Sequence, residues 1–260
     1  MKRKSSFFYV RVVLTVLVAL TAVGFASFDY KNIDFLKALQ DTFCNISVMF
    51  SKPAFHHFTF LHAVQSLGIT AALAFLTTLL GAIISLPVSF FAAGNLSNHA
   101  VSRILKNIVA VIRAVPTVLW VLIFATAVGL GSEAAVLGMM FHTMGYLIKA
   151  YSETFEKQNS GIIEALRACG GNWWHIIFNA VLPVSAAELA AWTFLRFEIN
   201  FGIAVAMGAA AGAGGLGYEL FMASGFYFDV REAGFITITI LLAVFALEYL
   251  STVIKNKILR

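Results

Sequence analysis

Long apolar stretches alternate with short polar connections along most of the chain. A spanning helix needs about 20 predominantly apolar residues, because it rises about 1.5 Å per residue across a hydrocarbon core of about 30 Å. The stretches that meet this requirement fall at about 8–27, 61–93, 107–130, 133–149, 185–211 and 234–253. The pattern therefore predicts an all-α membrane protein with six transmembrane helices, forming one transmembrane domain over residues 1–260.

Two parts of the pattern are less regular than the rest. The N-terminal stretch begins with basic residues 2–4 and resembles a signal peptide, but its apolar run from 10 to 28 is long enough to span, so we favour a retained first helix. The second stretch exceeds one span, and Pro87 is expected to kink its far end. Residues 29–59 mix polar and aromatic side chains, which predicts an external loop with a short amphipathic helix.

Basic residues concentrate on one side of this predicted topology, and cytoplasmic loops carry an excess of Lys and Arg. With the N-terminus inside, the external side holds only Lys31, Lys37, Lys52 and Arg231, and Arg196 falls within a membrane segment. The cytoplasmic side holds Lys2, Arg3, Lys4, Arg11, Arg103, Lys106, Arg113, Lys149, Lys157, Arg167, Lys255, Lys257 and Arg260. The count predicts that both termini are cytoplasmic.

Composition excludes several classes of protein. Hydrophobic residues make up 60% of the chain and charged residues 12%, whereas soluble domains carry about 25% charged residues. The net charge is +5, but the basic residues flank apolar segments and form no separate patch, so nucleic-acid binding is not expected. The sequence has no phosphate-loop motif, no H-E-x-x-H motif and no nucleophile constellation. We expect neither an enzyme nor a bound cofactor.

The cysteines and histidines indicate no metal site or disulfide. Cys44 and Cys169 fall on opposite sides of the predicted membrane, so they are expected to be unpaired. His56, His57 and His62 are close in sequence, but they lie at a membrane boundary, where amphipathic rings are ordinary. No metal ligands are assigned.

The predicted cytoplasmic segment 150–184 is long enough for two short helices. The first runs from 161 to 169 and ends at Gly170 and Gly171, because glycine accepts the left-handed cap conformation. The second contains two tryptophans and is expected to stop at 182–183, where Pro183 interrupts the hydrogen-bond ladder. Exposed apolar side chains on such a helix-turn-helix favour a protein partner.

This segment resembles the EAA loop of ABC-importer permeases, which reads E-A-A, three residues, G, nine residues, I, one residue, L-P. Leu166 replaces the third-position alanine and Ala180 replaces the isoleucine, and the spacing is otherwise the same. The residues that the resemblance assigns to ATPase coupling are Glu164, Ala165, Leu166, Gly170, Leu182 and Pro183.

The resemblance extends over most of the chain. The stretch 70–93 is similar to the second helix of methionine-importer-like permeases, and 208–217 is similar to their external glycine-rich segment. Arg113-Ala114, 127–131 and 195–200 are similar to phosphonate ABC-transporter permeases. This implies the type I importer permease fold, in a bacterial inner membrane, for a phosphonate or related phosphorus oxyanion. It also implies a homodimer, cytoplasmic ATPase subunits and an external substrate-binding protein.

The glycine-rich run has three interpretations. A nucleotide cradle lacks the strand that such a site requires. Small residues also allow close helix packing. We favour non-helical backbone at the external end of the pathway, where irregular chain can line a cavity. The predicted gate glycines are Gly208, Gly212, Gly214, Gly215 and Gly217.

The predicted translocation path contains Arg196, Glu198 and Arg113. Arg196 lies near the bilayer centre, where a charge requires a partner or a watery cavity. Either it bridges to Glu198 of a second copy, or it supplies positive potential for the anion. Arg113 either snorkels to the interface or pairs with Glu188. Two broader alternatives are an importer permease for another small solute and a secondary transporter, which would not need the EAA-like loop.

Overall fold

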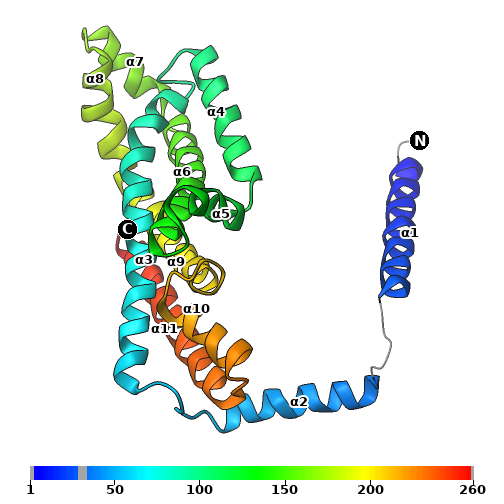
Figure 1. The fold of residues 1–260 in the computed structure, drawn as a ribbon. Helices are drawn as coiled ribbons and strands as arrows, with labels where there is room; N and C mark the ends of the chain where they lie inside the picture. Colours follow the sequence, from blue (N-terminus) through cyan, green and yellow to red (C-terminus); the bar gives the residue numbers. More distant parts are fainter. Residues whose placement is uncertain (1–2, 29–33, 259–260) are drawn as a thin grey trace. The chain divides into compact units, whose positions relative to one another are not determined.

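The computed structural model describes residues 3–28 and 34–258, and every regular element within these ranges is a helix (Figure 1). The chain forms two compact units that divide between Ile46 and Ser47. The predicted all-α class is therefore confirmed for the part of the chain that the structure describes.

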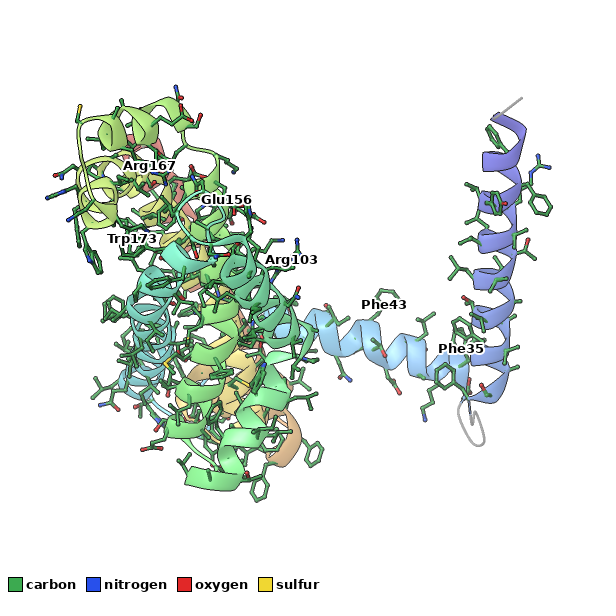
Figure 2. The ribbon with its side chains drawn as sticks, turned by 90° about the horizontal axis from the view of Figure 1, so that it is seen from above. Phe35, Phe43, Arg103, Glu156, Arg167 and Trp173 are labelled. Carbon is green, nitrogen blue, oxygen red and sulfur yellow. The ribbon has the colours of Figure 1, made fainter. Side chains whose placement is uncertain are left out.

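The first unit contains α1 (Arg3–Ser27) and most of α2 (Phe35–Ser51). The described side chains of α1, from Phe7 onward, are all exposed, although the helix is strongly apolar. A helix that is apolar on every side needs non-aqueous surroundings, which agrees with a membrane span. The helix α2 is the one predicted within 29–59, and its aromatic side chains Phe35 and Phe43 project from it (Figure 2).

The second unit is a helical bundle with α6 at its centre, packed against α3, α4, α5 and α9. In Figure 1, α3 runs along the length of this unit, with α7 and α8 at one end and α10 at the other. Its elements are α3 (Phe60–Ala92), α4 (His99–Ala114), α5 (Thr117–Val128), α6 (Ser132–Glu156), α7 (Ser160–Ala168), α8 (Trp173–Ile176), η1 (Ile177–Val181), α9 (Leu182–Ala211), α10 (Gly215–Phe221), η2 (Met222–Phe226) and α11 (Val230–Ile258).

Two large clusters of buried apolar side chains hold α3, α6 and α9 together. One includes Leu73, Met139 and Phe201 and is closed by Val121 of α5. The other lies toward α7 and α8, and it includes Phe90, Leu147, Phe155 and Ile177. Glycines allow the helices to approach closely: a Cβ on Gly81 would come within 2.7 Å of the Thr143 side chain.

Pro116 overturns the predicted span at 107–130. Helix α4 ends at Ala114 and α5 begins at Thr117, and the two helices are bent by 89°. A proline disfavours the helical conformation of the residue before it. Val115 accordingly has φ −82° and ψ 123°, in the extended region. The expected single helix is therefore a broken pair.

Pro183 has the opposite outcome, and the predicted helix end at 182–183 is wrong. The chain stays helical from Trp173 to Ala211, through the π-helical turn η1 that directly precedes the proline. The N–H of Leu182 donates to the carbonyl of Ile177, five residues back. Such a wider turn relieves the clash between a proline ring and the preceding turn, so the helix continues.

One other boundary also differs from the prediction. Helix α6 continues to Glu156, so the connecting segment predicted to begin at 150 begins after that residue. Beyond the predictions, α10 and η2 form one continuous helical stretch between α9 and α11.

Among the described residues, four helices are long and apolar enough to cross a membrane, or five if the bent α4–α5 pair counts as one span. Helix α6, which corresponds to the predicted span at 133–149, is not one of them. It carries 14 buried residues and lies at the bundle centre. A helix that contacts mainly protein can carry more polar side chains than one that contacts lipid.

Candidate functional site

Arg196 lies in the middle of α9 with only 3% of its surface exposed. Its Nε donates to the Thr143 hydroxyl at 3.2 Å, and its Nη2 lies 3.0 Å from Nδ1 of His142. The guanidinium carbon also lies 5.1 Å from the centre of the Tyr146 ring, in a cation–π arrangement. Arg196 is thus held against α6 by side chains that carry no negative charge.

Asn200 extends this arrangement by one helical turn. Residues four apart share a helix face, so Asn200 and Arg196 point to the same side of α9. The Asn200 amide donates to the hydroxyls of Thr78 at 2.8 Å and Thr143 at 3.0 Å. Three helices therefore meet through polar side chains inside an apolar bundle. Its members are Thr78, His142, Thr143, Arg196 and Asn200, referred to below as the central polar cluster.

Within one chain, no hydrogen bond or ion pair among the described residues joins Arg196 to Glu198, which is half-buried. The predicted bridge from Arg196 to Glu198 of a second copy stays a prediction. Glu188 lies 3.6 Å from Lys157 in an ion pair, and no ion pair among the described residues joins it to Arg113. A buried charge that makes only neutral contacts is unfavourable by several kcal/mol unless another ligand or subunit compensates it.

The partners of Arg196 were not found from the sequence. His142, Thr143 and Thr78 lie within apolar stretches of two different predicted helices, and hydropathy does not determine how those helices face each other. Polar side chains in membrane segments face the bundle interior, and this rule could have indicated the partners of Arg196. Asn200, four residues from Arg196, was the clearest case of that rule.

The α7–α8 end has the predicted helix-turn-helix, and its first turn is a complete Schellman cap. Gly170 has φ +79°, which confirms the predicted left-handed conformation. The N–H of Gly171 donates to the Leu166 carbonyl at 2.9 Å, and the N–H of Gly170 donates to the Arg167 carbonyl at 3.0 Å. Asn172 then starts α8 with a capping box. The backbone here is fixed by its own hydrogen bonds.

The predicted coupling residues are divided between the surface and the interior of this end. Glu164, Ala165 and Pro183 are exposed, whereas Leu166 and Leu182 are half-buried. Arg167 and Trp173 are labelled there in Figure 2. Trp173 anchors the end through a 2.8 Å hydrogen bond from its indole to the Leu96 carbonyl.

An aromatic pair is exposed at the same end. Trp174 and Phe178 are 56% and 59% exposed, and their rings stack with centroids 6.0 Å apart. Large exposed aromatic side chains on a rigid cap are typical of a protein contact.

The glycine-rich run is mostly helical, in contrast to the prediction. Gly208 belongs to α9, and Gly215 and Gly217 belong to α10, so only 212–214 is non-helical. A Cβ on Gly208 would lie 2.6 Å from the Gly214 carbonyl, and one on Gly217 would overlap the Val205 carbonyl. The run therefore allows the close packing of α10 on α9 that was one of the three interpretations. Positive φ angles at Gly212 and Gly214 make the turn between the two helices.

Residues 85–258 match the family model described as binding-protein-dependent transport system inner membrane component. This match extends from α3 through the described part of α11. The chain belongs to this family.

Relatives of this family member include transport permeases for phosphorus compounds. The phosphate-import permease protein PhnE of Mycolicibacterium smegmatis is 35% identical over 191 residues, which cover 73% of this chain and 35% of that protein. The phosphite transport system permease protein PtxC of Stutzerimonas stutzeri is 33% identical over 191 residues, covering 72% and 68%. The matched region thus spans only about a third of the first relative.

The fold of the family member is also that of a solved importer. A chain of the MetNI methionine ABC transporter, solved in inward-facing conformations, superposes with a TM-score of 0.71 at 21% identity. The superposition covers 79% of this chain and all of the other. The predicted type I importer permease fold is thereby confirmed.

The family match includes three of the regions described above. The α7–α8 end, the glycine-rich run and Arg196 all lie within residues 85–258. Thr78 of the central polar cluster precedes the matched residues, as does the segment leading into α3.

Proposed function

We propose that this family member is the membrane-spanning permease subunit of an ABC importer for a phosphonate or a related phosphorus oxyanion. An external binding protein delivers the solute, separate cytoplasmic ATPase subunits provide the energy, and a second copy of the chain completes the pathway in a bacterial inner membrane. The relatives named for phosphate and phosphite support this substrate class. The observation that carries it is the buried Arg196 with no acidic partner among the described residues.

The chemistry of Arg196 fits an oxyanion better than a neutral solute. Its guanidinium presents donors in a planar fork that matches phosphate and phosphonate oxygens. In a water-poor interior, an arriving anion supplies the missing countercharge. Binding of the anion therefore lowers the free energy of the buried guanidinium. Tyr146 and His142 hold the fork without neutralising it.

Arg113 extends the proposed anion path toward the α7–α8 end. It lines a cavity of about 230 Å³ together with Lys106 and Lys149. Lys106 pairs with Glu156 at 2.6 Å and Lys149 pairs with Glu153 at 3.5 Å. Arg113 has no such ion pair among the described residues, so it remains available to an anion.

The α7–α8 end is the proposed docking surface for the ATPase. Glu164, Ala165, Leu166 and Gly170 form its first half, and Leu182 and Pro183 follow the aromatic pair. Its rigid cap supports this role, because a fixed backbone transmits force between subunits without being remodelled. The excess of basic residues counted in the sequence supports a cytoplasmic location for this end and for both termini.

The opposite end, with Gly208, Gly212, Gly214, Gly215 and Gly217, is proposed to face the external binding protein and to close the outer gate. The tight contact between α9 and α10 supports this assignment, because small rigid shifts there would open or close the path. Glu198 lies on α9 between this end and Arg196, and it is assigned to the path or to the contact between two copies.

The proposal is tested by reconstituting the permease in liposomes with its ATPase and its binding protein. ATP hydrolysis is measured with the binding protein loaded with methylphosphonate, phosphite, phosphate or L-methionine. We expect stimulation by at least one phosphorus oxyanion and none by methionine. Stimulation by methionine alone, or uptake driven by an ion gradient without the ATPase, would contradict the proposal.

The role of Glu198 is tested by exchanging the charges, with Arg196→Glu and Glu198→Arg in one chain. A structural bridge between two copies survives this exchange, because each new charge again faces its opposite. A positive centre for an anion does not survive it. We therefore expect the double variant to assemble poorly or to transport poorly. Uptake at the wild-type rate would assign the two residues to a bridge.

A further inference from the structure

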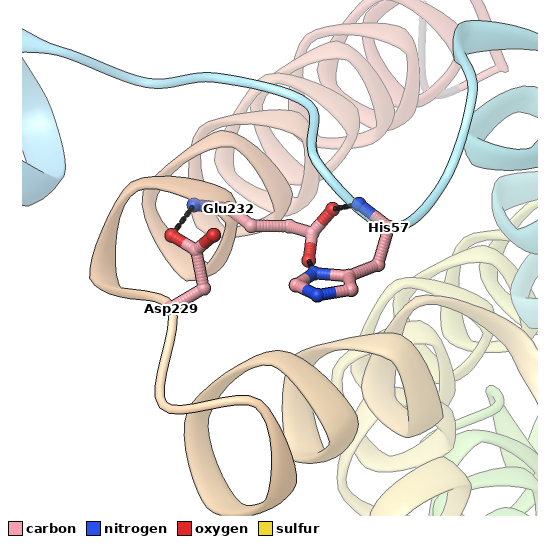
Figure 3. Close-up of side chains that lie close together, drawn as sticks. All are labelled: His57, Asp229 and Glu232. Carbon is pink, nitrogen blue, oxygen red and sulfur yellow. Dashed lines mark hydrogen bonds and ion pairs between the residues drawn. The ribbon is translucent and has the colours of Figure 1, made fainter.

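A second group of charged side chains, at the α10 end of the larger unit, contains His57, Asp229 and Glu232 (Figure 3). Here the segment that leads into α3 meets the start of α11. His57, Asp229 and Glu232 offer ligand atoms that all lie within 4.8 Å of one another. These three residues are called the α10-end triad below.

Glu232 is held so that one carboxylate oxygen is fixed and the other faces a histidine. Its side chain is 1% exposed. Its Oε1 accepts from the backbone N–H groups of His57 at 2.7 Å and His56 at 3.0 Å. Its Oε2 lies 2.7 Å from Nδ1 of His57. The backbone thus fixes one oxygen and orients the other for a ligand.

Asp229 follows the same pattern. Its Oδ1 accepts from the backbone N–H groups of Arg231 at 3.0 Å and Glu232 at 3.1 Å, and its Oδ2 contacts Nδ1 of His56. Partial burial raises the pKa of the Asp229 carboxyl, but hydrogen bonds from His56 and from the backbone outweigh this and hold the pKa below its usual value. In both carboxylates the backbone holds one oxygen, and the other oxygen contacts Nδ1 of a histidine.

The imidazole of His57 is oriented as well. It stacks on the Tyr227 ring with centroids 4.0 Å apart and an interplanar angle of 4°. Its side chain is 43% exposed, which gives a path from solvent to the buried Glu232. Such outer contacts that fix ring and carboxylate orientation are the usual support of a metal site.

We propose that the α10-end triad binds one divalent transition-metal ion of the Zn²⁺ class, through His57, Asp229 and Glu232. One nitrogen and two oxygen donors suit Zn²⁺ better than Ca²⁺ or Mg²⁺, which take oxygen ligands. The two carboxylates neutralise the ion. His57 gives up the proton that it shares with Glu232.

The ligand atoms lie within 4.8 Å of one another, so the more distant of them must move closer together to bind one ion. Two ligands on one tetrahedral zinc, each at about 2.0–2.1 Å, lie about 3.3 Å apart. The contact between His57 and Glu232 therefore opens by roughly 0.6 Å when both bind the ion. The exposed ring of His57 can make this shift while Glu232 stays in place. The ion would then join the segment before α3 to the start of α11.

The test uses the full chain, purified in detergent without a polyhistidine tag and stripped with a chelator. Zn²⁺ binding is measured by calorimetry, and Co²⁺ serves as a coloured probe of coordination by visible absorption. We expect one ion per chain. The variants His57→Asn and Asp229→Asn keep hydrogen-bonding groups at these positions, so they are expected to fold and to bind Zn²⁺ at least about tenfold more weakly.

The matched control is His62→Asn. His62 lies near the triad and pairs with Glu219 at 3.3 Å, but it is not among the three ligands. We expect its affinity to equal that of the wild type, with thermal unfolding confirming that all variants are folded. The assignment is overturned if the wild type binds no ion, if His57→Asn binds as tightly as the wild type, or if His62→Asn loses as much affinity as His57→Asn.

Discussion

Arg196 and Glu232 are both almost completely buried, with 3% and 1% exposure, but their surroundings treat the charge in opposite ways. Glu232 accepts hydrogen bonds from three backbone N–H groups and contacts the ring of His57. Arg196 has a hydroxyl, an imidazole nitrogen and an aromatic ring around it, and none of them is an acid.

This difference separates two uses of a buried charge. Glu232 is stabilised within the chain by backbone N–H groups and by His57, so its charge joins two segments and stabilises the α10 end. The charge of Arg196 is not compensated by an acidic side chain among the described residues, so an arriving anion can compensate it. The comparison implies that removing Glu232 harms folding, whereas removing Arg196 harms transport.

The largest effect on stability is expected for Glu232→Leu. The change leaves buried backbone N–H groups without an acceptor and removes the partner of His57, so unfolding should become easier by about 3–5 kcal/mol. Thermal and denaturant unfolding of the purified chain in detergent measure this. The control Glu219→Leu removes a carboxylate from the more exposed pair with His62 and should have a smaller effect. Equal losses of stability in the two variants would contradict the special role of the buried Glu232.

A smaller loss is expected for Gly217→Ala, which tests whether the α10 end is held by packing as well as by charge. The new Cβ overlaps the Val205 carbonyl, so the change should destabilise by about 1–3 kcal/mol. Gly202→Ala is the matched control, because its Cβ meets no atom within 4 Å. That variant should be neutral or stabilising by up to about 1 kcal/mol. Identical unfolding curves for both variants would contradict the close contact of α9 and α10.

At the α7–α8 end, Gly170→Val should impose a penalty of about 1–2 kcal/mol, because a β-branched residue disfavours the left-handed cap. ATP hydrolysis stimulated by the loaded binding protein should fall, while membrane insertion stays normal. Gly170→Asn is the control, since asparagine tolerates this conformation. Unchanged stimulation in the valine variant would count against a coupling role for this turn.

The smallest change in stability is expected at Arg196 itself. Arg196→Met removes an uncompensated charge and keeps an apolar side chain of similar length, so the free energy of unfolding should change by less than about 1 kcal/mol or increase. Unfolding in detergent is the measurement, in parallel with Glu232→Leu. A loss as large as that of the glutamate variant would show that Arg196 is compensated after all.

The fold was predictable where one residue or one pattern determined the outcome. Apolar length indicated α1, α3, α9 and α11, and the glycine at 170 indicated the left-handed cap. The prolines were predictable only in part. Pro116 broke its helix because Val115 took the extended conformation. Pro183 did not break its helix, because the π turn η1 precedes it. Hydropathy and proline position alone do not predict such a turn.

The contacts of the charged groups were also predictable only in part. Membrane depth indicated Arg196, because a charge near the bilayer centre requires a partner or a watery cavity. Its partners on α6, and the contact between His57 and Glu232, join residues more than 50 positions apart. Such contacts follow from helix packing and register, which hydropathy does not determine.

The most direct test of the account is oxyanion uptake by Arg196→Ala in proteoliposomes that contain the ATPase and the loaded binding protein. Arg103→Ala, which removes an exposed arginine from α4, serves as the control. With equal amounts of assembled complex, uptake of the phosphorus oxyanion by Arg196→Ala should fall at least about tenfold, which corresponds to about 1.4 kcal/mol. Uptake by Arg103→Ala should match the wild type. Wild-type uptake by Arg196→Ala would contradict the claim that Arg196 lies on the anion path.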